Sequence, residues 1–148
     1  MYSLFDPEGA QTLLQRFHRL TPGHSRHWGT MSANQMICHL SDQLRVALGE
    51  IPSQQRKNIF WRTFIKWMVL YVPLTYPKGA PSMPEMRTTS ASQWEADKAE
   101  FLRLVEAFRQ RAVTGDWSPH PAFGRLTGRE WGILAARHIN HHLRQFGE

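Results

Sequence analysis

Apolar side chains recur every three to four residues in four segments of the chain, which is the spacing of one face of an α-helix. Each segment opens at a residue that can cap a helix: Asp6 followed by proline, Ser32 with Gln35, Ser92 with Glu95, and Thr127 with Glu130. The first three close at glycine or proline: the sequence TPGH at 21–24, Gly49 with Pro52, and Gly115. No strand-like alternation competes with these stripes. The pattern therefore predicts an all-α fold, a four-helix bundle in a single domain spanning residues 1–148.

The connection between the second and third predicted helices is unusually long. Residues 57–76 are apolar but contain three cations, and their uninterrupted apolar run, from Trp67 to Leu74, is too short to span a bilayer. We expect a short helix that covers the mouth of the bundle or forms a dimer contact; an in-plane membrane helix is the alternative. The sequence PKGAPSMPEM at 77–86 predicts an ordered crossover loop. Such a crossover is typical of a bundle in which consecutive helices are not antiparallel neighbours.

Composition and charge exclude some classes of protein but do not indicate a function. The chain has 148 residues, of which 41% are hydrophobic and 20% charged, as in an ordinary globular protein. Its 18 Lys and Arg against 12 Asp and Glu give a net charge of +6, but the arginines are dispersed, so we expect no nucleic-acid partner. The first 20 residues mix polar and apolar side chains, unlike a signal peptide, and Cys38 is the single cysteine. These features predict a cytoplasmic protein without stable membrane insertion.

Three histidines on predicted apolar faces are the candidate chemistry. His138 and His142 are about one helical turn apart and project from the same face, and His39 lies on the apolar face of the second helix. If these faces meet, three imidazoles converge and leave a coordination position open, as in a working metal site. His141 shares a face with His138 at i, i+3 and is an alternative to His142. The plainer interpretation is a histidine-rich helix with one buried ring and two exposed ones.

The residue types limit which metal ions the site could bind but do not identify one. Three histidines suit a divalent ion, with zinc and nickel as the first candidates and cobalt and iron also compatible. Second partners should orient each imidazole through its other nitrogen, and Asp42, Gln145 and Glu130 are the candidates, each also explicable as a surface or capping residue. Cys38 points away from the face of His39 and is not counted as a ligand. The remaining histidines, outside metal spacing, are expected in solvent: His18, His24, His27 and His120.

The layout resembles a known family. The segment MSANQMICHLSDQLR at 31–45, followed by HPAFGRLTGREWGILAARHINHHLRQFG at 120–147, resembles the DinB/YfiT-like superfamily of metal-dependent helical bundles, and more narrowly a branch described only as a domain of unknown function. The resemblance covers nearly the whole chain. It implies a four-helix bundle with a long crossover between helices two and three, often a homodimer. It also implies a divalent metal held by His39, His138 and His142.

The function predicted from these features is a metal-dependent transferase or hydrolase. Related proteins of known activity use low-molecular-weight thiols, so the resemblance implies a small-molecule substrate and a metal that activates a thiol or a water. No catalytic residue is assigned, because fold does not fix reaction. Two other classes remain open: a non-catalytic metal- or ligand-binding module of a stress response, and association with nucleic acid or a membrane surface through the basic residues and the Trp61–Tyr71 segment.

Overall fold

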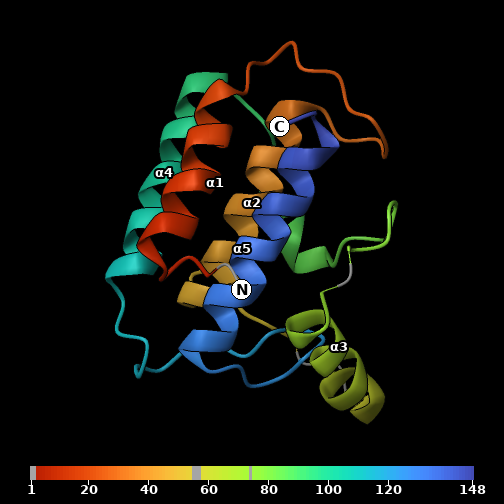
Figure 1. Ribbon diagram of the computed structural model, residues 1–148, viewed down its shortest axis with the longest axis vertical. Coiled ribbons are helices and arrows are strands. Elements are labelled where there is room, and N and C mark those ends of the chain that lie inside the picture. Colours follow the sequence, from red (N-terminus) through yellow and green to blue (C-terminus); the bar gives the residue numbers. More distant parts are fainter. Residues whose placement is uncertain (1–2, 55–57, 74) are drawn as a thin grey trace.

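The computed structural model describes residues 3–54, 58–73 and 75–148, and these residues form helices without any strand. Four of the helices are long: α1 (Pro7–Arg19), α2 (Ala33–Leu48), α4 (Trp94–Gln110) and α5 (Gly128–Gln145). Figure 1 shows that α1 and α5 run in one direction and that α2 and α4 run in the other. α2 contacts both α4 and α5, and α1 contacts α5. The prediction of an all-α fold is confirmed for the described part of the chain.

Local capping chemistry explains where the helices begin. The Asp6 carboxylate accepts a hydrogen bond from the amide of Gly9, and both bonds of the capping box form at Ser32 and at Thr127. At the end of α2, Gly49 adopts a φ of 85°, the left-handed conformation that glycine adopts most readily. These signals lie within a few residues of one another, so the sequence alone was sufficient to locate them.

The predicted capping box at Ser92 is wrong. The residue that caps α4 is Gln93, which has an extended backbone and no side-chain hydrogen bond to the helix. Ser92 therefore lies one residue outside, and its amide and hydroxyl donate instead to the carboxylate of Asp97, at 2.8 and 3.1 Å. Glu95 takes no part in this contact, because the acidic side chain that reaches back to Ser92 comes from Asp97.

The apolar connection after α2 forms a separate helical arm. A π-helical turn, Trp61–Ile65, continues into α3 (Lys66–Tyr71), and the arm packs on α5 through the fully buried Leu70. Lys66 of the arm also forms an ion pair with Glu130 of α5, with 2.8 Å between Nζ and Oε1. Most of its large apolar side chains remain exposed: Ile59, Phe60, Trp61, Phe64, Trp67 and Tyr71.

These apolar side chains of the arm are exposed rather than packed on the long helices, so the part of the arm that covers those helices is limited to the contact of α3 with α5. The dimer contact and the in-plane membrane helix stay predictions. Lys57 and Leu74, which belong to the same expectation, lie outside the described residues. Among the helices of the described ranges, none is both long enough and apolar enough to cross a bilayer.

The crossover brings a backbone segment past the middle of α2. Because α2 ends at the opposite end of the molecule from the start of α4, the connecting chain has to travel back along the helices (Figure 1). On this path a short 3-10 turn, Pro84–Met86, packs against α2. The crossover is therefore ordered where it passes α2, and it delivers main-chain groups to that helix.

Large aromatic side chains hold the helices in place. The rings of Phe17 in α1 and Phe101 in α4 lie 4.4 Å apart between centroids, and both side chains are fully buried. In α5, Trp131 is also fully buried, and its indole nitrogen donates to the carbonyl of Ser118 at 2.9 Å. A buried indole with its N–H satisfied contributes apolar contact without leaving a polar group unpaired. This packing fixes α5, which carries most of the candidate site.

Candidate metal centre

The structure brings His39, His138 and His142 together. His138 and His142 lie one turn apart on α5, and His39 approaches them from the middle of α2. The Nε2 atom of His138 is 3.0 Å from Nε2 of His39 and 3.1 Å from Nε2 of His142. The candidate ligand atoms of the three rings all lie within 4.8 Å of one another. The two predicted faces thus meet, with His142 rather than His141 beside His138, and the alternative of one buried and two exposed rings is wrong.

The second nitrogen of each ring faces a hydrogen-bond acceptor. These acceptors are the main-chain oxygen of Met86 for His39 (2.8 Å), Oε1 of Gln43 for His138 (2.8 Å) and Oε1 of Gln145 for His142 (2.7 Å). Since each acceptor is an oxygen without a proton to give, Nδ1 must carry the hydrogen in all three rings. In the neutral imidazole, Nε2 then carries no hydrogen and has a free lone pair. Three lone pairs consequently point into one space.

Burial keeps the three rings neutral. It lowers the pKa of His39, lowers that of His142 to about 3, and places that of His138 well below its usual value. The neighbouring imidazoles lower the pKa of His138 further, because a second positive charge nearby would be repelled. Neutral imidazole is the form that binds metal ions.

The separation of the nitrogen atoms fits a small divalent cation. Zinc binds imidazole nitrogen at about 2.0–2.1 Å, which in a tetrahedral site places two ligand nitrogens about 3.3 Å apart. The observed separations of 3.0 and 3.1 Å are slightly shorter. Facing lone pairs at this distance repel one another unless a proton or a cation lies between them, and the Nδ1 contacts assign the ring protons elsewhere. The donor set therefore could hold a metal ion, whose identity it does not decide.

Only one of the three expected partners of the imidazoles touches a ring. Gln145 binds His142, as expected, and its own amide nitrogen donates to the carbonyl of Trp28 at 2.7 Å, which fixes the orientation of the amide. Glu130 does not approach a histidine: it completes the capping box of α5 and pairs with Lys66. Asp42 has an indirect role.

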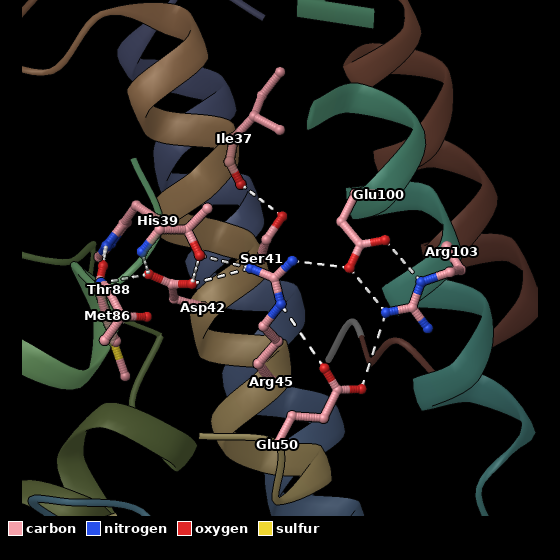
Figure 2. A network of polar contacts seen from close by, with 11 residues as sticks. Ile37, His39, Ser41, Asp42, Arg45, Glu50, Met86, Thr88, Glu100 and Arg103 are labelled. Carbon is pink, nitrogen blue, oxygen red and sulfur yellow. Dashed lines mark hydrogen bonds and ion pairs between the residues drawn. The ribbon is translucent and has the colours of Figure 1, made fainter. Parts of the chain in front are cut away.

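The carboxylate of Asp42 holds the crossover against α2. It is fully buried and accepts hydrogen bonds from the amides of Thr88 and Thr89, at 2.7 and 2.9 Å. Figure 2 shows this carboxylate beside the segment that carries Met86, whose carbonyl faces His39. Asp42 thus fixes the backbone segment whose Met86 carbonyl orients His39, and it does so at Thr88, two residues after Met86.

An ion-pair network continues from Asp42 to α4. Arg45 lies 3.2 Å from Asp42 and 2.8 Å from Glu100, and Glu100 also pairs with Arg103 (Figure 2). The guanidinium groups of Arg103 and Arg45 hold the pKa of Glu100 at about 2. This arrangement compensates the buried charge of Asp42, which would otherwise be costly.

Two of the actual partners were not predicted. Gln43 follows His39 by one turn on α2, but it binds His138 on the opposite helix. Its position on the inner face was a usable signal, although its target depended on how α2 and α5 pack. The carbonyl of Met86 had no signal, since every residue has a carbonyl group and its role comes from the path of the crossover.

The other histidines and the cysteine divide between core and surface. His141 is half-buried and outside the three-histidine cluster, with its ring 5.0 Å from that of His142. His120, expected in solvent, is buried; its Nδ1 accepts from the amides of Ala122 and Phe123, and burial lowers its pKa to about 3. Cys38 is buried and apart from the cluster, and burial, together with Asp97, raises the pKa of its thiol to about 11.

A large open pocket lies beside α5, on a different face from the three-histidine cluster. Its volume is about 1100 Å³, and its walls come from the loops around Trp28 and Tyr76 and from five residues of α5: Ala136, Arg137, Asn140, His141 and Arg144. None of the three clustered histidines lines it, but His141 does. No pattern in the sequence indicates this pocket.

One comparison with known families matches the chain. A family model described as "Protein of unknown function (DUF1569)" matches residues 6–148. No curated protein and no solved structure matches the chain significantly. The match covers both histidine-bearing helices, so the three-histidine arrangement lies entirely within the family region.

Proposed function

The chain belongs to the DUF1569 family, for which no function is established, and we propose that it is a divalent-metal-dependent enzyme whose ion is held by His39, His138 and His142. The proposal rests on one observation. Three neutral imidazoles direct unprotonated Nε2 atoms at one point, while each Nδ1 hydrogen is held by an oxygen acceptor. Metal-binding histidines commonly have such oriented second nitrogens.

Each ligand in this proposal has its own support. His39 is held by the crossover, His138 by α2 through Gln43, and His142 by its own helix through Gln145. Three separate parts of the chain thus fix the directions of the three rings before any ion binds. Preorganised ligands of this kind favour tight binding, because less freedom is lost on coordination.

Three protein ligands leave at least one position of the ion for another molecule. A zinc or nickel ion at this point would lower the pKa of a bound water or small thiol and so supply a nucleophile near neutral pH. The chain's own contribution is to keep the three imidazoles neutral by burial and to hold their orientation. A transfer to, or hydrolysis of, a small electrophilic molecule is the reaction class we propose.

We further propose that the fold is the four-helix bundle of the DinB-like type, in a single domain. Support comes from the four long helices, from the crossover between α2 and α4, and from the placement of one histidine in α2 and two in the last helix. The homodimer implied by the resemblance belongs to the same proposal.

One observation favours a second candidate, a non-catalytic centre in a binding module. The three rings are only 6%, 9% and 6% exposed for His39, His138 and His142, and none of them lines the pocket. A closed site of this kind is typical of a structural ion. The two candidates differ in their response to chelation: a structural ion is needed for folding, whereas an ion with an open position can be removed and replaced.

The test is the metal content of the untagged protein, measured by elemental mass spectrometry after purification without added metal. We expect about one divalent ion per chain, lost in His39→Ala and in His138→Ala and retained in His18→Ala, a control at an exposed histidine of α1. Circular dichroism distinguishes loss of ligand from loss of fold. Full occupancy in both ligand variants, or no metal in the wild type after reconstitution, would overturn the proposal.

A further inference from the structure

α5 presents two neighbouring faces with different chemistry. The residues at 138, 142 and 145 follow one another at i, i+4 and i+7 and belong to the three-histidine cluster or hold it. The residues one position earlier, at 137, 141 and 144, have the same spacing and line the large pocket. Consecutive residues of a helix differ in direction by about 100°. The pocket is therefore a second site, carried by the same helix but outside the cluster.

Three aromatic rings form one wall of this pocket. The ring of His141 lies between those of Trp28 and Tyr76, with 5.6 Å between centroids on each side. All three residues line the pocket, and each is half-buried. The planes of these rings are inclined to one another by 57° and 42°, so the wall offers aromatic faces and edges that an organic ring can contact.

The charges around the same wall are of one sign. Lys78, Arg137 and Arg144 line the pocket, and no carboxylate does so among the described residues. Lys78 lies 4.7 Å above the ring of Trp28, and the guanidinium of Arg137 lies 5.6 Å from the ring of Tyr76. Two of the three cations thus lie over aromatic rings of the wall. A positive, partly apolar concavity raises the local concentration of small anions.

We propose that this pocket binds a small organic anion with a flat apolar part, the anionic group contacting Arg144, Arg137 and Lys78 and the flat part resting against Trp28, Tyr76 and His141. The open pocket has a volume of about 1100 Å³, slightly above the range of about 300–1000 Å³ that is typical of small-molecule pockets, so it has room for such a ligand. Arginine suits carboxylate and phosphate groups alike, because its guanidinium donates two parallel hydrogen bonds to either. The proposed ligand is therefore an aromatic ring system that bears either a carboxylate or a phosphate group.

The inference goes beyond the proposed metal function and does not depend on it. None of the three proposed ligands lines the pocket, so binding of the anion is expected with or without a metal ion. The affinity for the anion should therefore remain within about threefold when the protein is stripped of metal. Loss of binding on stripping would contradict two separate sites, whereas absence of metal in the purified protein would leave this proposal as it stands.

The experiment is calorimetric titration of the full chain with three probes of the same shape: 1-naphthoate, 1-naphthyl phosphate and the neutral 1-naphthamide. We expect at least one of the two anions to bind at least tenfold more tightly than the amide; which of them does so distinguishes a carboxylate from a phosphate ligand. Arg144→Gln should weaken binding of the anion at least tenfold, because a charged hydrogen bond is lost. Arg129→Gln, an exposed arginine of α5 outside the pocket, should not.

Two further variants locate the apolar contact. Trp28→Ala should weaken the binding of all three probes. Trp67→Ser, which removes an exposed tryptophan from the arm, should leave their binding unchanged. The proposal is overturned if the anions bind no better than the amide, if Arg129→Gln costs as much as Arg144→Gln, or if Trp67→Ser abolishes binding. The last result would place the probes on the arm. Circular dichroism of each variant verifies that the helices are retained.

Discussion

His142 and Gln145 form a pair within one turn of α5, with 2.7 Å between Nδ1 and Oε1, and the same amide donates to the carbonyl of Trp28 at 2.7 Å. Gln145 is nearly fully buried, so both contacts are shielded from water. One side chain therefore joins the three-histidine cluster to a wall of the pocket. Its amide oxygen accepts from His142 of the cluster, and its amide nitrogen donates to Trp28 of the pocket wall.

Replacing Gln145 by leucine should weaken metal binding about 10- to 100-fold, because His142 loses the contact that fixes its ring and its tautomer. Gln43→Leu should act similarly through His138. Competition with a chromophoric chelator measures the affinity. Gln110→Leu, at an exposed position of α4, is the matched control and should bind metal like the wild type. An unchanged affinity in both inner variants, with the fold intact, would show that these amides do not orient the ligands.

Replacing His141 by phenylalanine should leave one metal ion per chain, whereas His142→Phe should remove it. The reason is geometric: the ring of His142 contributes its nitrogen to the cluster, while the ring of His141 lies among Trp28 and Tyr76. Elemental analysis of the two purified variants decides between them. The reverse pattern would assign the ligand pair to 138 and 141.

Asp42→Asn should destabilise the metal-free protein by about 3 kcal/mol, because removing one member of a buried charged network leaves its partners uncompensated. The change affects the amides of Thr88 and Thr89 as well as Arg45. Urea unfolding gives the free energy. Asp116→Asn, at an exposed carboxylate, should change it by less than about 0.5 kcal/mol. Equal effects of the two substitutions would contradict the role assigned to Asp42.

Buried His120 should make the protein sensitive to acid. Burial lowers its pKa to about 3, whereas in the unfolded chain it should titrate near 6.5. As the pH falls below about 6.5, the unfolded state binds the proton first, so stability decreases by about 1.4 kcal/mol per pH unit until the pH approaches the folded pKa. The variant His120→Phe lacks this contribution.

The measurement is the difference in unfolding free energy between metal-free wild type and His120→Phe from pH 8 to pH 4. The wild type should lose stability more steeply below pH 6.5, and the two should run parallel above it. The other histidines are common to both proteins and cancel in the difference. Parallel curves over the whole range would mean that His120 is solvated in the folded state.

The helices, and the shared face of His138 and His142, were open to prediction because they depend on short-range rules, whereas the approach of His39 depends on how α2 packs on α5. A four-residue step decides that His138 and His142 share a face, whatever surrounds them. Capping at Ser32 and Thr127 likewise depends on side chains three residues away. The assignment failed at Ser92, where two acidic residues, Glu95 and Asp97, compete within one turn and only the entry path of the backbone decides between them.

The contacts that orient the rings and line the pocket could not be predicted in the same way. The carbonyl of Met86 reaches His39 only because the crossover packs on α2, and Gln43 reaches His138 only because α2 lies beside α5. The pocket combines residues around 28 and 76 with α5, and no local pattern links them. Packing between distant segments determines all of these contacts.

The one-residue offset between the two faces of α5 has a consequence for how this chain can vary. Inserting or deleting a single residue between 137 and 145 would rotate everything that follows by about 100°, moving pocket residues towards the cluster and cluster residues away from it. Substitutions on the outer side of the helix change neither face. The length of this segment should therefore be fixed in any functional variant, even where its amino acids are free to differ.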